Sequence, residues 1–301
     1  MRNAFIEELV ALAAQHDHIA LVVGDLGYSV VEPFADRFPE RFVNAGVAEQ
    51  NMTGLAAGMA SEGFHVFTYS IANFPTFRCA EQIRNDVDYH RLPVTVVVVG
   101  GGLAYGALGY SHHAVQDYAV MRSFPNMLIA APGDPMEVRA CMRYLVQRPQ
   151  PSYLRLGKAG EPSFHAEVPS VEPGRWLAVA EPAREAKGVL LTTGATLASA
   201  MDWQREGHYP DHAVRSMPLW GMASKGAQPA QLEGIERLIT VEDHLADGGF
   251  GSWMCEALGA RTHLRQRVES IHLSPDVCGM VGGQRVLNEL GGLRPGLAGV
   301  A

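Results

Sequence analysis

Cysteine is scarce in this sequence and is nowhere paired. Only four cysteines occur among 301 residues, and no two share a Cys-x-x-Cys spacing: Cys79, Cys141, Cys255 and Cys278. This absence argues against a zinc site and against a redox dithiol. We expect reduced, mostly buried thiols, as in cytoplasmic proteins.

Long apolar runs are absent as well. No window of about 18 uninterrupted apolar residues occurs, so we expect no membrane span. Residues 1–15 carry Arg2, Glu7 and Glu8 and have the pattern of an amphipathic helix. They lack the apolar core and the small-residue cleavage site of a signal peptide. These absences favour a cytoplasmic protein.

A surplus of positive charge is also missing. The chain has 24 Lys and Arg residues against 32 Asp and Glu, a net charge of −8. A protein that binds a nucleic-acid backbone would carry a basic stripe, so we expect no nucleic-acid binding. A local basic pocket for a small phosphorylated substrate remains open. The hydrophobic content of 47% indicates a globular protein with a sizeable core.

The sequence does contain short apolar runs that alternate with helical patterns. The run 94–99 is apolar almost throughout, so we expect it inside a sheet that helices cover on both faces. The alternation indicates mostly parallel, doubly wound α/β sheets. In the first half of the chain, the expected strands are residues 19–23, 64–69, 94–99, 127–131 and 153–156.

The length and a change of character near the middle of the chain favour two domains. Residues from 158 to about 187 carry four prolines and little periodicity, which is typical of a linker. We predict a first domain at 1–160, a linker at 161–185 and a second domain at 186–301. The second domain has expected strands at 189–193, 213–217, 237–241 and 269–272, and we expect the tail after Leu290 to be irregular.

Glu49 is the first candidate for chemistry. It stands among Val47, Ala48 and Met52 at the start of a helical pattern rich in Ala and Gly. Burial there would disfavour the charged carboxylate unless a partner compensates, and an acid held this way can donate a proton or a short hydrogen bond. The alternative is an ordinary first-turn Glu that favours the helix dipole.

Three ordered stretches resemble one known family. The stretches 46–52, 73–85 and 106–121 are similar to the pyrimidine-binding half of transketolase-type thiamine diphosphate enzymes. The longest piece is Phe74-Pro-Thr-Phe-Arg-Cys-Ala-Glu-Gln-Ile-Arg-Asn-Asp86. The resemblance covers most of residues 20–160 and is looser in the second half, which is similar to the C-terminal domain of transketolases. It implies a thiamine diphosphate pyrimidine-binding domain followed by a transketolase C-terminal-type domain.

The resemblance assigns cofactor contacts. It implies that Glu49 hydrogen-bonds a ring nitrogen of the aminopyrimidine and so favours the tautomer that removes the thiazolium proton. Phe74 and Phe77 are implied to pack against that ring, although a core aromatic pair is the alternative. Ile71 matches a third wall position of the cofactor pocket. Asp25 matches an Asp near the cofactor, with a turn-forming Asp as the alternative.

The resemblance also assigns substrate contacts. His112, after a Gly-rich loop, matches the histidine that contacts the donor sugar and assists proton transfer. Its neighbour His113 is less diagnostic. Ser29 matches a serine that contacts the substrate phosphate, with a surface serine as the alternative.

Some positions depart from the transketolase pattern. Leu108 replaces an acid that reads a donor hydroxyl, and Gly100 replaces a phosphate-contacting histidine. The expected phosphate arginine is not matched in register; Arg155 and Lys158 are the nearest cations, and Lys158 lies in the better register. Donor recognition is therefore expected to differ from that of ordinary transketolases.

The half of the enzyme that would hold the diphosphate and Mg²⁺ is missing from this sequence. No Gly-Asp-Gly motif with its Asn-containing metal loop occurs. The resemblance therefore implies an N-terminal transketolase subunit that carries the diphosphate-binding domain, in an α2β2 heterotetramer. Small residues at Gly54 and Gly58 would permit close helix contact with a partner chain or within this one.

The sequence as a whole predicts the C-terminal (β) subunit of a split transketolase. Such an enzyme moves a two-carbon ketol unit from a ketose, expected to be phosphorylated, to an aldose. The alternative is a subunit of another thiamine enzyme, similar to 1-deoxyxylulose-phosphate synthase or to the β subunit of a 2-oxo-acid dehydrogenase or decarboxylase. A non-catalytic regulator that kept the fold is disfavoured by the retained acid, aromatic residues and histidine.

Overall fold

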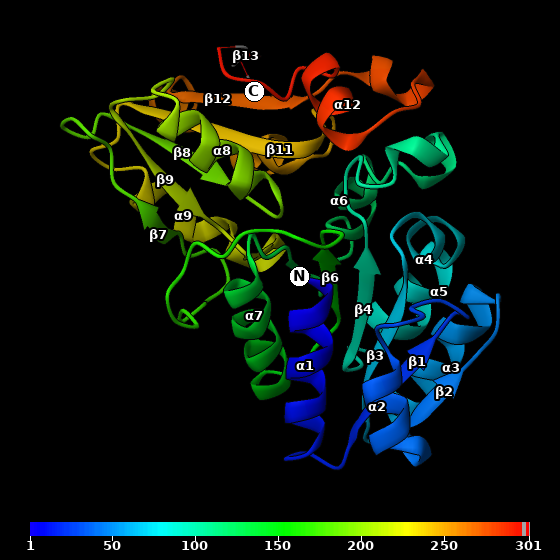
Figure 1. Ribbon diagram of the computed structural model, residues 1–301. Coiled ribbons are helices and arrows are strands. Elements are labelled where there is room, and N and C mark those ends of the chain that lie inside the picture. The colour runs from blue at the N-terminus through cyan, green and yellow to red at the C-terminus, as the bar shows by residue number, and fades with distance from the viewer. Residues whose placement is uncertain (297–298, 301) are drawn as a thin grey trace.

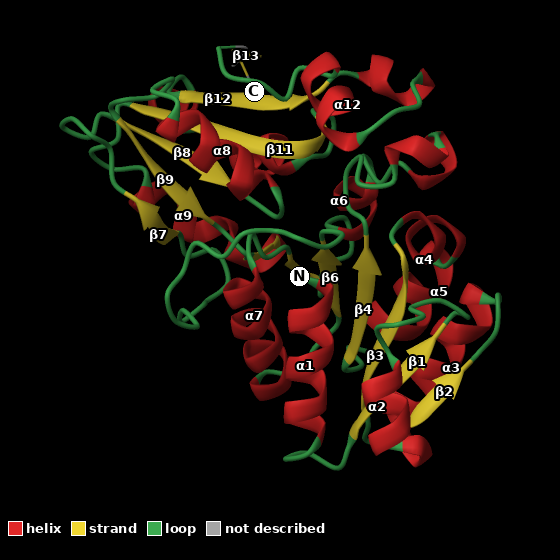
Figure 2. Ribbon diagram, viewed as in Figure 1, coloured by secondary structure: helices red, strands yellow, loops and turns green. Residues whose placement is uncertain are grey.

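The computed structural model describes residues 1–296 and 299–300 and contains two α/β units (Figure 1). Each unit has one sheet with helices packed on its faces, as the red and yellow elements of Figure 2 show. The first unit contains the N-terminus, and the second unit contains the C-terminal strand. No helix in the described part of the chain is long and apolar enough to cross a membrane.

The first sheet has the strand order β10-β5-β6-β4-β3-β1-β2, and every neighbouring pair except β10–β5 is parallel. Its chain-order strands are β1 (Ile19–Val23), β2 (Phe42–Asn44), β3 (His65–Ile71), β4 (Val94–Val99), β5 (Leu128–Ala130) and β6 (Ser152–Leu156). The helices of this unit are α1 (Arg2–Ala13), α2 (Glu32–Arg37), α3 (Glu49–Ser61), α4 (Asn73–Arg78), α5 (Ala80–Gln82), α6 (Asp117–Met121) and α7 (Pro135–Gln147).

Strand β4 shows why this sheet is doubly wound. All six of its residues are buried. Val94, Val96 and Val98 belong to one apolar cluster, with α3, while Val97 and Val99 belong to another, with α1 and α7. Because successive side chains point to opposite faces of a strand, an apolar run needs helices on both sides.

The second sheet has the strand order β13-β12-β11-β8-β9-β7. Its edges, β7 and β13, pair antiparallel, and the four inner strands are parallel. The strands are β7 (Leu177–Ala180), β8 (Gly188–Thr192), β9 (His212–Ser216), β11 (Arg237–Leu245), β12 (Val268–Leu273) and β13 (Gly299–Val300). The helices are α8 (Thr196–Arg205), α9 (Gln228–Gln231), α10 (Phe250–Leu258), α11 (Thr262–Arg265) and α12 (Gln284–Leu290).

The predicted fold class, two mostly parallel α/β domains, is confirmed. Four short strands differ from the sequence prediction. The expected linker 161–185 contains β7, and the expected irregular tail contains β13. Strands β2 and β10 (Leu219–Gly221) were not expected, and β10 of the second half completes the first sheet. These strands have two to four residues and lie at sheet edges, so their partners rather than their own patterns define them.

A buried ion cluster joins the two units. Arg155 of β6 donates from Nε to Oδ2 of Asp117 at 2.7 Å and from Nη1 to Oδ1 of Asp243, on β11, at 2.6 Å. Its side chain is only 2% exposed, and its guanidinium lies 4.3 Å from the ring centroid of Tyr118. Two buried carboxylates therefore depend on one buried cation.

We predict that Arg155→Leu will lower the free energy of unfolding by about 3–5 kcal/mol, because Asp117 and Asp243 would be left buried without a cation. Chemical denaturation of the isolated chain measures this. The control is Arg285→Leu, at a side chain that is 81% exposed. Equal losses in the two variants would contradict the structural role of Arg155.

A second polar cluster ties the connecting segment to α7. Asp134 accepts from the backbone N–H of Glu137 through Oδ1 and from those of Phe164 and His165 through Oδ2. Oε1 of Glu137 lies 3.0 Å from Nε2 of His165, and its Oε2 accepts from Gly133 and Ser216. The hydrogen bond to Glu137, opposed by burial, raises the pKa of His165.

This raised pKa predicts a pH dependence of stability. Protonated His165 favours the folded state, so its contribution is complete below its ordinary pKa of 6.5 and is lost as pH rises through the raised value. The difference in Tm between the protein and its His165→Gln variant should therefore shrink from about pH 5.5 to about pH 8.5. The variant His263→Gln, at an exposed histidine, is the control. A difference that stays constant with pH would disprove the contribution.

Candidate functional site

The candidate residues gather at the carboxyl ends of the parallel strands in the first sheet. The chain leaves β1 toward β2 on one side of the sheet order, and leaves β3 toward β4 on the other side. Ligands of open α/β sheets bind at such a reversal of strand order. Strands β1 and β3 are neighbours there, and Gly24 just beyond β1 donates to the carbonyl of Tyr69 on β3.

Glu49 is fixed at this reversal point as the first residue of α3, with its side chain 5% exposed. The turn before α3 is held by Asn44, whose Oδ1 accepts from the backbone N–H of Asp25 at 3.1 Å and of Gly46 at 3.0 Å. Gly46 has a φ of 72°, which favours glycine. A Cβ on Gly24 would lie 3.8 Å from Cγ of Glu49, so the acid packs against the end of β1.

The buried carboxylate has a charged partner that the sequence did not reveal. Nη1 of Arg78 donates to Oε1 of Glu49 at 2.9 Å. The same guanidinium lies 4.4 Å from the ring centroid of Phe74. Arg78 is the last residue of α4, and its side chain is 52% exposed. The expected compensation for burial of Glu49 is therefore present as an ion pair.

His112 also contacts Phe74. The two ring centroids are 5.2 Å apart in an edge-on arrangement. Its loop is tied to α4 by Asn73, whose Nδ2 donates to the carbonyl of Ser111 at 3.1 Å. Burial lowers the pKa of His112, and the neighbouring His113 adds to this, so the neutral imidazole is favoured near neutral pH. A neutral imidazole can both accept and donate a proton.

Lys158 stands at the far end of this group. Its Nζ lies 5.2 Å from the ring centroid of Tyr105, and the Tyr105 ring lies 6.4 Å from that of His112. We call this series the site row, which consists of Glu49, Arg78, Phe74, His112, Tyr105 and Lys158. Its residues follow the carboxyl ends of four strands, β2, β3, β4 and β6, in the chain.

Gly100 explains one departure from the transketolase pattern. Its φ is 83°, and a Cβ there would overlap the Tyr105 ring. The ring of Tyr105 thus occupies the space beside the position where a histidine was expected. The end of the site row where the donor sugar is expected therefore combines the aromatic ring of Tyr105 with the cation Lys158.

Asp25 and Ser29 lie beyond Glu49, on the loop after β1. Asp25 accepts through Oδ1 from Asn44 and Tyr28, and these hydrogen bonds hold its pKa below the ordinary value. Its φ of 55° and that of Ser29, 64°, indicate a constrained loop. Asn44 links Asp25 to the turn before Glu49, whereas Ser29 is exposed and donates its N–H to Glu32.

The other expected residues are placed less centrally. Ile71 ends β3 and is half-buried, and Phe77 on α4 is 45% exposed. Arg155 requires a correction: it was expected to be a candidate for a substrate phosphate, but it is buried between Asp117 and Asp243. His113 is fully buried, and its Nε2 lies 3.4 Å from the carbonyl of Gly106, so it supports the loop.

The sequence did not lead us to expect three residues at the site: Arg78, Asn44 and Tyr105. Arg78 stands inside the longest matching motif, and Tyr105 is the aromatic residue within the Gly-rich loop, so both had a weak signal. Nothing in the sequence indicates that Arg78 reaches Glu49, which is 29 positions away.

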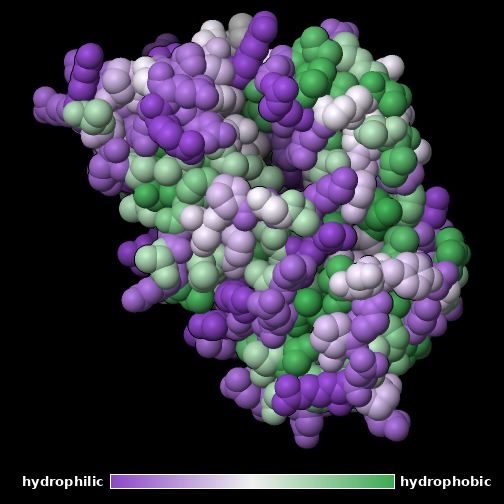
Figure 3. All heavy atoms as spheres, in the orientation of Figure 1, coloured by the Kyte–Doolittle hydropathy of each residue, from purple (hydrophilic) through white to green (hydrophobic). Residues whose placement is uncertain are grey.

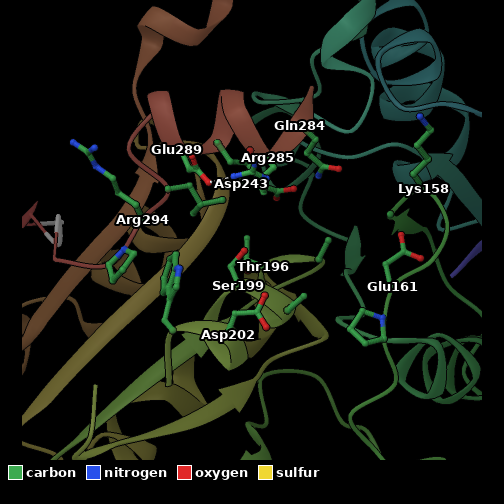
Figure 4. A pocket seen from close by; sticks show the side chains of 18 of the residues that line it. Lys158, Glu161, Thr196, Ser199, Asp202, Asp243, Gln284, Arg285, Glu289 and Arg294 are labelled. Carbon is green, nitrogen blue, oxygen red and sulfur yellow. Dashed lines mark hydrogen bonds and ion pairs between the residues drawn. The ribbon is translucent and has the colours of Figure 1, made fainter. Parts of the chain in front are cut away.

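Two other features lie mostly outside the site row. Among the described residues, one cluster could hold a metal ion, Asp134, Glu137 and His165. All four of its carboxylate oxygens already accept hydrogen bonds from the chain. A cavity of about 810 Å³ lies between parts of the two units, where Figure 3 shows a hollow. Figure 4 shows residues that line it: Lys158 and Glu161 of the loop after β6, Thr196, Ser199 and Asp202 of α8, and Gln284, Arg285 and Glu289 of α12.

This cavity touches the site row only at Lys158. It is lined by neither Glu49, Phe74 nor His112. The acidic and aromatic part of the site row therefore lies outside this cavity, with Glu49 buried and with Phe74 and His112 half-buried.

Comparison with known proteins supports the resemblance to transketolases that was stated from the sequence, over both halves of the chain. The family described as "Transketolase, pyrimidine binding domain" matches residues 1–160. A subunit of the apulose-4-phosphate transketolase of Phocaeicola vulgatus is 33% identical over 267 residues, which are 85% of this chain and 83% of that protein. A putative transketolase C-terminal section of Methanocaldococcus jannaschii is also 33% identical over 267 residues, with 86% and 82% covered.

A solved structure extends the similarity to the fold. A split-gene transketolase, described as an inactive β4 tetramer, superposes with a TM-score of 0.82 at 30% identity, covering 97% of this chain and 93% of that chain. The 1-deoxy-D-xylulose-5-phosphate synthase of Aquifex aeolicus is 31% identical over 304 residues, but this chain spans only 46% of it. The matches of near-equal length are thus the transketolase sections.

We predict that Gly100→Ala will lower the free energy of unfolding by about 2–4 kcal/mol, from the left-handed backbone and the overlap with Tyr105. In a Tyr105→Ala background, the same substitution should cost only about 1–2 kcal/mol, because the backbone penalty alone remains. Urea denaturation of the four proteins measures both values. An equal cost in the two backgrounds would show that Tyr105 does not fill this space.

Proposed function

The chain belongs to the transketolase family, and from this premise we propose that it is the C-terminal subunit of a split thiamine diphosphate-dependent transketolase. The observation that carries the proposal is the placement of Glu49: a carboxyl group 5% exposed, at the reversal point of a parallel sheet, joined through Arg78 to Phe74, whose ring contacts His112. The proposed reaction transfers a two-carbon ketol unit from a ketose, expected to be phosphorylated, to an aldose.

The site row fits the aminopyrimidine half of thiamine diphosphate. Such a ring needs one hydrogen-bonding acid and an apolar face, and Glu49 and Phe74, which both contact the Arg78 guanidinium, supply them. When bound, this cofactor supplies the nucleophilic carbon on which two-carbon transfer depends. In the proposal Glu49 holds a ring nitrogen through its carboxyl oxygen, and Phe74, Phe77 and Ile71 form the apolar walls. Asp25, held with a lowered pKa, lies near the cofactor as an anion.

The substrate side of the site row has different chemistry. His112, favoured in its neutral form, accepts and returns the proton of a donor hydroxyl group. Lys158 is exposed at the end of the site row and is the proposed ligand of an anionic substrate group. Ser29, which lies beyond Glu49 at the opposite end of the site row from Lys158, is a separate proposed contact for a phosphate. Tyr105, which fills the space beside Gly100, makes this end narrower and more apolar than a histidine would.

We propose that a second polypeptide completes the site. In the described part of the chain, the three-residue cluster that could bind a metal has all its oxygens occupied by internal hydrogen bonds. We therefore propose that an N-terminal transketolase subunit holds the diphosphate and Mg²⁺. Helix α3 leaves Gly54 and Gly58 open, with no atom within 4 Å of a Cβ built on either. Such a surface suits close contact with a partner chain, in a proposed α2β2 assembly.

A second candidate reaction has one supporting observation, the 31% identity to a 1-deoxy-D-xylulose-5-phosphate synthase. That reaction class and the 2-oxo-acid dehydrogenases release carbon dioxide from a 2-oxo acid. A carbon dioxide assay with pyruvate, in parallel with a ketose and aldose assay, distinguishes the two classes. We expect aldose-dependent transfer without carbon dioxide.

We predict that Glu49→Gln will lower the turnover of the reconstituted complex by at least about a hundredfold, because an amide cannot deliver the proton that the carboxyl group provides. Size-exclusion chromatography should show unchanged assembly. Glu62→Gln, at an exposed residue directly after α3, is the matched control and should retain full activity. Turnover of Glu49→Gln within about tenfold of the unsubstituted complex would defeat the proposed role.

A further inference from the structure

Arg78 has no role in the proposed reaction, yet it contacts two residues that do. Its Nη1 donates to Oε1 of Glu49 at 2.9 Å, and its Cζ lies 4.4 Å from the ring centroid of Phe74. The proposed function, on which this inference rests, gives both of these contacts to the aminopyrimidine ring. One side chain therefore occupies the hydrogen-bonding partner and the apolar face that the cofactor would use.

A guanidinium group is well suited to this position. It is planar, carries N–H donors around its edge and packs on aromatic rings, as a flat nitrogen heterocycle does. We propose that Arg78 is a latch on the cofactor site: in the cofactor-free chain it holds Glu49 and covers Phe74, and its side chain leaves both when the ring binds. Arg78 is thus a positioning residue and not a catalytic one.

The structure indicates which partner of the ion pair moves. Glu49 is fixed in the first turn of α3 with 5% of its side chain exposed, whereas the Arg78 side chain is 52% exposed. The main chain at Arg78 is held, because its carbonyl accepts from Nε2 of Gln50 at 2.9 Å. The guanidinium can therefore rotate into solvent while α4 stays in place.

The latch also explains how the acid tolerates the absence of cofactor. A buried carboxylate without a cation or hydrogen-bond donors would destabilise the fold. Within the described residues, Arg78 is the one group that donates a hydrogen bond to Oε1 of Glu49. Because half-exposed ion pairs and exposed cation–π contacts are weak, a cofactor anchored elsewhere by its diphosphate can displace the side chain.

The test is a double-mutant cycle on the assembled complex with its N-terminal subunit. Arg78→Gln, Glu49→Gln and the double variant are compared with the unsubstituted protein, and calorimetry gives the Kd of thiamine diphosphate with Mg²⁺. Arg78→Gln should tighten binding by roughly three- to tenfold when Glu49 is present, because the competing ion pair is gone. The tightening should be clearly smaller when Arg78→Gln is combined with Glu49→Gln. Arg84→Gln, at an exposed arginine on the next turn, should leave the Kd unchanged.

Each other outcome overturns the latch. A weaker Kd for Arg78→Gln would mean that Arg78 helps to hold the bound ligand, and no change, or equal tightening in both backgrounds, would mean that it does not compete for Glu49. Arg78→Lys, which keeps the charge but not the planar group, should tighten binding less than Arg78→Gln and gives a second variant if the first is unstable. Failure of the proposed function is separate: it would appear as full turnover of Glu49→Gln, whatever Arg78 does.

Discussion

The desolvation of buried carboxylates is the constraint on which much of this structure depends. Glu49, Asp117, Asp243 and Glu137 are all buried, and each has a cationic or ionisable partner on a different element. Because an unpaired buried charge is costly, these pairs fix elements that are far apart in sequence. Arg155 joins the two sheets, His165 fastens the connecting segment, and Arg78 joins α4 to α3. The candidate site and the fold around it are thus stabilised by the same kind of interaction, a buried carboxylate paired with a cationic or ionisable group.

The sequence predicted the interior of the fold better than its edges. The strand ranges 19–23 and 94–99 agree with β1 and β4, because a continuous run of β-branched residues has few alternatives to a buried parallel strand. Strands β2, β7, β10 and β13 were missed or placed in irregular segments. A strand of two to four residues carries no period of its own, and β10 pairs with β5, almost 90 residues earlier in the chain. Such pairings are set by tertiary packing.

Contacts at the site that depend on tertiary packing were likewise beyond prediction from the sequence. Family resemblance selected Glu49, Phe74 and His112, which the structure brings close to one another through Arg78 and α4. It could not reveal the contact of Arg78 with Glu49, because two side chains from different helices meet only after the sheet has formed. Arg155 was misjudged for the opposite reason. It was one of the two cations nearest to the expected phosphate position, although out of register, but alternate residues of a central strand face opposite sides, and its side chain points to α6 and β11.

Strand β10 holds the two halves of the chain together, because it belongs to the second half of the sequence but pairs in the first sheet. It leaves the second unit, runs antiparallel to β5 along the outer edge of the first sheet, and places the fully buried Trp220 against Tyr118 and Phe250. A fragment cut at residue 160 would present the bare edge of β5, ready to pair with any extended chain it meets. Recombination between relatives of this protein must therefore exchange both halves together, or carry this short strand along with the sheet that it seals.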